Sequence, residues 1–169
     1  DHAELIWQDV GDELFLRERA EDIATFTKAI YFSESDDEPI ILLKDVGVEI
    51  PVATQIFVYA KNRQRIFSVI SAVLDKLQLN IQDARLQSTS DDQAFDIFYV
   101  LDDKDLPIGA DKKLCRFVIK ELAEGIKNPN FAGFNIQRRT PRVLKHFSLK
   151  TSAKITNKTG ASTTSLEII

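Results

Sequence analysis

Residues 54–77 read TQIFVYAKNRQRIFSVISAVLDKL, and this stretch decides the fold. Five of its first six residues are β-branched or aromatic, which is typical of a buried strand. The polar residues that follow, at positions 61–65, are expected to form a turn. Apolar residues then recur at helical spacing, at Ile66, Ile70, Val73 and Leu77. The stretch therefore predicts a strand, a turn and a helix in succession.

Two further strands are expected after this helix. Leu79 and Ile81 alternate with polar residues, and Ala84 and Leu86 continue the alternation one residue out of phase. A phase change of this kind indicates a β-bulge. Residues 95–101 alternate in the same way and predict the next strand.

A second helix is expected at residues 111–125, and a last strand at residues 147–155. The complete order, β-α-β-β-α-β, predicts an α+β fold of the ferredoxin-like type, with a four-stranded antiparallel sheet and two helices on one face. The side chains of the second helix that we expect to face inward are Leu114, Phe117, Val118 and Leu122.

The two ends of the chain extend this domain. Residues 1–38 predict a helical segment and an acidic linker, because apolar residues recur at helical spacing up to Ile30 and the linker leads into Pro39. Residues 40–43 form a short apolar run that suits an edge strand. Residues 159–169 begin another strand, whose pattern is similar to that of residues 54–58.

Composition narrows the class of protein. The chain has 44% hydrophobic residues, but no apolar run approaches the roughly 20 residues that span a bilayer. A single cysteine, Cys115, cannot form an internal disulfide and fits a reducing cytoplasm. The chain begins with Asp1 and contains no methionine, so we interpret it as a fragment. Its net charge of −4 argues against a nucleic-acid-binding protein.

Residues that could perform catalysis are scarce. The two histidines, His2 and His146, are far apart, and neither has a second histidine or a cysteine at metal-ligand spacing. Cys115 lies between apolar residues, which favours a packed thiol. We therefore predict no catalytic residue, no metal site and no cofactor in this chain.

One position suits a small ligand. The turn at residues 61–65 leads into the amino end of a helix, where unpaired N–H groups favour a carboxylate. Asn62 could contact such a ligand, and residues 80–83 could receive its amino group. A purely structural role is equally open, in which Asn62 caps the helix.

Several segments resemble a known family. Residues 55–63, followed by Ile66 and Phe67, resemble the first strand and turn of an ACT domain, and residues 79–86 and 94–102 resemble its second and third strands. Two further segments, one toward each end of the chain, make the resemblance more specific. They are WQDVGDELFLR at residues 7–17 and RVLKHF at residues 142–147, which resemble the first C-terminal ACT region of the bifunctional uridylyltransferase/uridylyl-removing enzymes (the GlnD family).

This resemblance implies a regulatory region that senses glutamine and acts allosterically on catalytic domains outside this chain. Residues 1–38 would follow an HD domain, residues 39–158 would form an ACT domain, and residues 159–169 would begin a second one. The parent enzyme would be cytoplasmic, would use Mg²⁺ and would modify the PII signal protein. No contact with nucleic acid or membrane is expected, and the oligomeric state is open.

The resemblance also implies a ligand site. The ligand-edge positions would be Asn62, Arg63, Arg65, Asn80, Ile81 and Asp83. The family's turn reads Asp-Arg-Pro-Gly-Leu, and Arg65 stands at the position of its glycine. This departure keeps an alternative open, a ligand-free interaction module that holds domains or subunits together.

Overall fold

The computed structural model of the protein describes most of the chain in two compact units, Asp1–Ile136 and Gln137–Ile169. A four-stranded sheet belongs to the first unit and a two-stranded sheet to the second. The described residues are 6–7, 10, 12–33, 35, 37–47, 52–63, 65–89, 92–128, 152–157 and 164–168.

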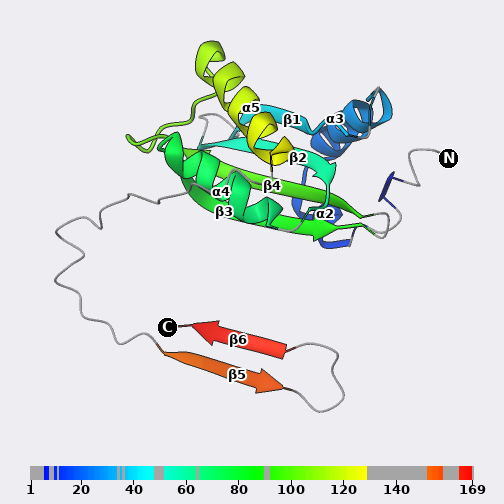
Figure 1. The fold of residues 1–169 in the computed structure, drawn as a ribbon, viewed down its shortest axis with the longest axis vertical. Helices are drawn as coiled ribbons and strands as arrows, with labels where there is room; N and C mark the ends of the chain where they lie inside the picture. Colours follow the sequence, from blue (N-terminus) through cyan, green and yellow to red (C-terminus); the bar gives the residue numbers. More distant parts are fainter. Residues whose placement is uncertain are drawn as a thin grey trace. The chain divides into compact units, whose positions relative to one another are not determined.

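The sheet of the first unit is antiparallel throughout (Figure 1). Its spatial order is β1-β2-β4-β3. The predicted four-stranded antiparallel sheet is thus confirmed, and a register shift between Ile81 and Asp83 confirms the predicted β-bulge. The strands are β1 (Ile40–Val46), β2 (Ala53–Lys61), β3 (Asn80–Ser88) and β4 (Gln93–Leu101).

The fourth strand of the sheet is not the one that the sequence pattern indicated. β1 pairs antiparallel with β2, so the short run expected at 40–43 fills the position beside β2. Of the strand predicted at 147–155, residues 147–151 lie outside the described residues, and its last residues belong to the separate two-stranded sheet. The physical reason is proximity, because a strand directly before β2 reaches its edge through a short hairpin.

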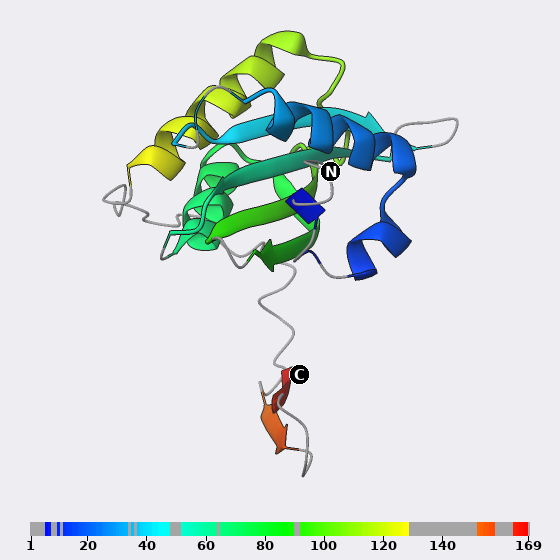
Figure 2. The same ribbon diagram turned by 90° about the vertical axis from the view of Figure 1, so that its right-hand side faces the viewer.

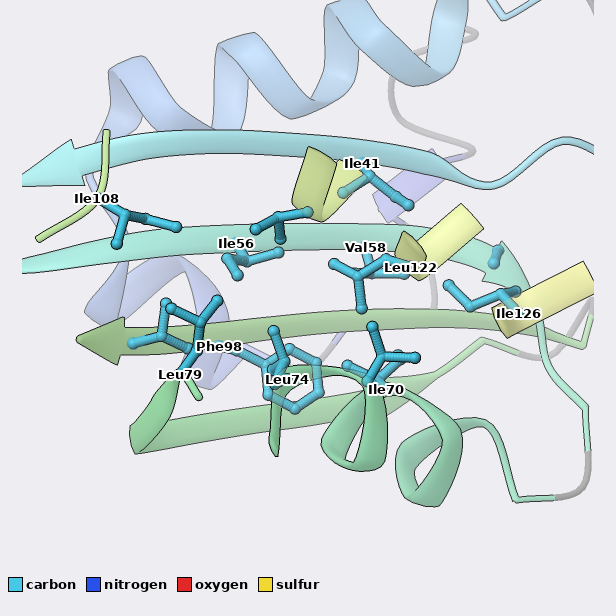
Figure 3. Packing of buried hydrophobic residues seen from close by; sticks show 14 residues of the cluster. Ile41, Ile56, Val58, Ile70, Leu74, Leu79, Phe98, Ile108, Leu122 and Ile126 are labelled. Atoms are coloured by element: carbon cyan, nitrogen blue, oxygen red, sulfur yellow. The ribbon is translucent and has the colours of Figure 1, made fainter. Parts of the chain in front are cut away.

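Two helices cover one face of the sheet, as predicted. They are α4 (Ile66–Lys76) and α5 (Lys112–Lys127), and their apolar side chains pack on those of β1, β2 and β4 (Figure 3). The carboxylate of Asp111 caps α5 by accepting hydrogen bonds from the backbone N–H groups of Lys113 and Leu114. These hydrogen bonds lower the pKa of Asp111 below its ordinary value.

The contact between α4 and α5 is close. A Cβ atom added to Gly125 would lie 2.9 Å from a methyl carbon of Val73, so only glycine lets the helices approach to this distance. One prediction for α5 is wrong, since Phe117 does not face inward but is 49% exposed. The buried stripe of α5 runs through Cys115, Val118 and Leu122 instead, and Phe117 lies to one side of it.

The opposite face of the sheet is also covered. The predicted amino-terminal helical extension forms α2 (Asp12–Arg17) and α3 (Ala20–Tyr31), which lie on the far side of the sheet from α4 and α5 (Figure 2). The ring of Phe26 in α3 stacks on that of Phe57 in β2, with centroids 4.1 Å apart. Because β2 and β4 are covered on both faces, they are buried almost continuously, which explains the unbroken apolar run in residues 56–60.

The second unit contains one described hairpin. β5 (Ala153–Asn157) pairs antiparallel with β6 (Thr164–Ile168), and six residues of sequence separate the two strands, as six separate β1 from β2. The expected strand at the end of the chain therefore exists as β6. The resemblance between residues 54–58 and this strand stays a prediction about a repeated domain.

Candidate functional site

The turn between β2 and α4 holds the first half of the predicted ligand site. The backbone N–H of Asn62 donates to the carbonyl oxygen of Asp92 at 2.7 Å, and its side-chain amide donates to Ser88 Oγ at 3.2 Å. The side chain is therefore directed to the end of β3 rather than to the helix. Asn62 does not cap α4, because the residue at the cap position is Arg65, whose side chain makes no capping hydrogen bond.

Arg65 adopts a backbone conformation that glycine prefers. Its φ of 71° and ψ of 16° lie in the left-handed region, where a side chain costs about 1–2 kcal/mol. A side chain therefore stands at a position whose backbone conformation glycine adopts more readily. That side chain is exposed.

Arg63 connects the same turn to the end of α5. Its guanidinium Nη1 donates to the carbonyl oxygen of Lys127 at 3.4 Å. The carboxyl end of a helix carries a partial negative charge, which favours a cation at this position. The hollow that both residues line measures only about 10 Å³. This hollow is too small for an amino acid.

The second half of the predicted site lies at the start of β3. The side-chain amide of Asn80 donates to the carbonyl oxygen of Asp102 at 3.1 Å, and Ile81 is partly exposed. The carboxylate of Asp83 accepts from the backbone N–H of Ala84 at 2.9 Å.

The structure does not bring these two halves together within one chain. Asn62 contacts Ser88, the last residue of β3, whereas Asn80 is the first. The nine residues of β3 extend over about 26 Å at the usual rise per residue. Ligand binding by the six residues stays a prediction, and a single ligand could touch both halves only if they came from different chains.

A buried polar cluster lies on the α2/α3 face and was not foreseen from the sequence. Glu18 follows α2, and its carboxylate accepts hydrogen bonds from Gln55 Nε2 at 2.9 Å and Tyr99 Oη at 2.9 Å. Arg85 Nη1 also donates to Glu18, and the Arg85 guanidinium carbon lies 5.0 Å from the centroid of the Tyr99 ring. Burial raises the pKa of Tyr99, and the hydrogen bond and charge of Glu18 raise it further.

The sequence carried a weak signal for this cluster. Gln55 interrupts an otherwise apolar strand, and such a residue needs a polar partner when the strand is buried. The identity of the partner depends on the approach of α2, which sequence spacing does not specify. We refer to Glu18, Gln55, Arg85 and Tyr99 as the Glu18 cluster.

Two further groups are perturbed by burial on the α4/α5 face. Burial raises the pKa of Asp96 from 3.8 to about 6, although a hydrogen bond that its carboxylate accepts from the backbone of Gln87 opposes this increase. Burial also raises the pKa of the Cys115 thiol, whose sulfur lies 3.4 Å from the carbonyl oxygen of Ile108. A raised thiol pKa disfavours the reactive thiolate, so Cys115 is suited to packing.

Curated relatives align with this chain from end to end. The protein of Stutzerimonas stutzeri is 38% identical over 170 residues, that of Pseudomonas fluorescens Pf-5 is 36% identical over 169 residues, and that of Ectopseudomonas mendocina is 37% identical over 169 residues. Each is described as a bifunctional uridylyltransferase/uridylyl-removing enzyme. This chain matches one region of those enzymes.

The match covers 99–100% of this chain but only 19% of each relative, so the chain spans about a fifth of their length. No family model matches the chain, and no solved structure matches it. In the part of the chain that the structure describes, no three potential metal ligands gather in one place. Every helix in the same described ranges is too short or too polar to cross a bilayer. His2 and His146 lie outside the described residues.

Proposed function

We propose that this chain is the regulatory, glutamine-sensing ACT region of a PII uridylyltransferase/uridylyl-removing enzyme. The observation that carries this proposal is the end-to-end match to one region of such enzymes. The ferredoxin-like sheet with two helices on one face supports it, because this is the architecture of an ACT domain. The chain itself would perform no chemistry, and Mg²⁺-dependent transfer and removal of UMP would belong to the rest of a cytoplasmic parent.

The mechanism would be a shift between two arrangements of the region. A ligand moves such an equilibrium only by binding one arrangement more tightly than the other. Glutamine bound to this region would favour one arrangement, and the catalytic domains would then remove UMP from the PII protein rather than add it.

The hairpin of the second unit supports a tandem arrangement. β5 ends before residue 158 and pairs antiparallel with β6, which lies within residues 159–169. In this proposal residues 39–158 form one ACT domain and residues 159–169 begin a second. Two copies would allow a glutamine site to form between them.

Calorimetry on this chain tests direct binding. We expect L-glutamine to release or absorb heat at millimolar or lower concentration, with D-glutamine and L-glutamate as matched controls that differ in handedness and in the side-chain amide. Absence of heat with millimolar L-glutamine would contradict glutamine binding by this region.

A second experiment tests the regulatory role in the full-length parent. Glutamine should increase the rate of UMP removal from PII in the intact enzyme, and deletion of this region should abolish the increase. If the deleted enzyme still responded to glutamine in the same concentration range, the regulatory proposal would be wrong.

A ligand-free interaction module is the second candidate. Two observations favour it: Arg65 adds a side chain at the turn where a ligand would approach the backbone, and the hollow beside Arg63 is small. The outer strands β1 and β3 each have one edge without a partner strand in this sheet, which suits pairing with another domain. Analytical ultracentrifugation discriminates the two, because the module would associate at micromolar concentration whether or not glutamine is present.

A further inference from the structure

Two buried ion pairs hold the amino-terminal helices to opposite edges of the sheet. Glu18, between α2 and α3, pairs with Arg85 of β3, and Asp22, in the first turn of α3, pairs with Lys44 of β1. β3 and β1 are the two outer strands. The carboxylate side chains are only 2% and 6% exposed, so each needs its cation. We refer to residues 12–31, which contain α2 and α3, as the strap.

The polar contacts of the strap hold it to the sheet only weakly. A buried ion pair contributes little net free energy, because the removal of both charges from water offsets most of their attraction. Beside Glu18, Gln55 Oε1 and Arg85 Nε are also buried without a hydrogen-bond partner among the described residues, which is unfavourable. Opening of the strap would return these groups to water. Arg85 would still keep a partner on its own strand, the carboxylate of Asp83 at 3.4 Å.

The strap also has the smaller share of apolar packing. Among the described residues it contributes two buried apolar side chains, Leu14 and Phe26, to the cluster on its face. α4 and α5 contribute six to the cluster on the other face, which are Ile70, Val73, Leu74, Val118, Leu122 and Ile126. Parts of a domain that bury less apolar surface open at a lower free energy, so the strap should open before α4 and α5 do.

We propose that the strap opens from the sheet as one unit while the sheet, α4 and α5 stay folded, and that the two buried ion pairs keep it closed. Opening exposes the rings of Phe57 and Phe95, which the strap covers in the closed state. The inference involves no ligand, so it stands or fails independently of the proposed glutamine sensing.

Native-state hydrogen exchange of this chain in increasing urea tests the proposal. We expect the α3 amides to exchange with a lower free energy of opening than the amides of β2 and α5. The urea dependence of that free energy should also be smaller for α3, because opening of the strap exposes less surface than unfolding of the whole domain.

Two variants remove the cations without changing the sequence of the strap. Lys44→Met and Arg85→Met should each increase the exchange rates of the α3 amides by about tenfold or more, because each leaves a carboxylate buried without its cation. The matched control, Lys76→Met, makes the same change in the ion pair with Glu121, where Lys76 is largely exposed, and it should leave the α3 rates unchanged. Ile70→Val should increase the rates of the α5 amides by about fivefold and also leave those of α3 unchanged.

Three results would overturn the proposal. A single free energy and urea dependence for every protected amide would mean that the strap and the domain unfold together. Equal acceleration of the α3 and α5 amides in the Ile70 variant would mean the same. Separate opening of the strap with unchanged α3 rates in both the Lys44 and the Arg85 variant would show that the ion pairs do not keep it closed. Continued protection of the β2 amides shows that each variant remains folded.

Discussion

The two faces of the sheet are built from different chemistry. The α4/α5 face is packed with aliphatic side chains from both helices and three strands, together with Phe98. The α2/α3 face combines stacked aromatic rings around Phe26 and Phe57 with the buried Glu18 cluster. Apolar packing is tolerant of exchange among similar side chains, whereas a buried polar cluster is stable only when each member keeps its partner.

This difference suggests a division of roles. The α4/α5 face is held by aliphatic packing, and the α2/α3 face adds hydrogen bonds between buried polar groups. The comparison also shows that the amino-terminal helices complete a layer of the fold, because without them β2 and β4 would expose the rings of Phe57 and Phe95.

Replacing Phe26 by alanine should produce the largest effect. The ring is buried and contacts both Phe57 and Phe95, so its loss should reduce the free energy of unfolding by about 3–5 kcal/mol. Urea denaturation followed by the fluorescence of Trp7, the only tryptophan, measures this directly. Trp7 donates a hydrogen bond to Thr27 of α3, so its emission also reports whether α3 stays on the sheet.

The exposed Phe32→Ala variant is the matched control, and it should be nearly neutral. If Phe26→Ala cost less than about 1 kcal/mol, α3 would be a separable extension, and the two faces would not contribute comparably to stability.

Asp96→Asn should make the α4/α5 face less sensitive to pH. Burial raises the pKa of Asp96 from its ordinary 3.8 to about 6, so the folded protein binds this proton more tightly than the unfolded chain does. Stability therefore falls as pH rises from about 4 to 6, by about 3 kcal/mol at most. The asparagine variant lacks this loss and should be more stable than the parent chain at pH 7 but not at pH 4.

Denaturation curves at unit intervals from pH 4 to pH 8 provide the measurement. The control is Asp103→Asn, an exposed position whose substitution should leave the pH profile unchanged. Parallel profiles for the parent chain and the Asp96 variant would mean that the Asp96 carboxyl group is not buried as described.

Glu18→Gln tests the polar cluster on the other face. The change keeps the size of the side chain and removes the charge that faces the Arg85 guanidinium, which should cost about 2 kcal/mol. The estimate is below that for a fully buried pair because the Arg85 side chain is about a quarter exposed. A double-mutant cycle with Arg85→Met isolates the coupling, and a coupling near zero would show that the two side chains act independently.

Much of this architecture could be predicted from local sequence patterns. The strand at residues 54–59, the helix that begins at Ile66 and the bulge after Ile81 follow from apolar periodicity and its change of phase. Each of these features depends on neighbouring residues only, which is the condition under which pattern reasoning works.

The partners of these elements could not be predicted in the same way. The pattern of residues 40–43 indicates a strand but does not specify that it pairs with β2, and Ile23 to Ile30 indicates a helix without stating which face of the sheet it covers. Gln55 and Glu18 are 37 residues apart, so their contact depends on the completed fold.

Arg65→Gly should have the smallest effect on stability, and it tests the turn at residues 61–65 as the ligand site. Glycine relieves the strain of a positive φ, but it also increases the entropy of the unfolded chain, so we expect a gain of only about 0.5–1 kcal/mol. The matched control is Gln78→Gly at the other end of α4, where φ is 58°, and it should show a similar gain.

If the turn binds the ligand, only the Arg65 variant should change glutamine affinity, because it alone opens the approach to the backbone at Asn62. If the ligand binds elsewhere, calorimetry should give the same affinity for both variants and the parent chain. A loss of stability in the Arg65 variant alone would mean that its side chain stabilises the turn, and the strain argument would then be wrong.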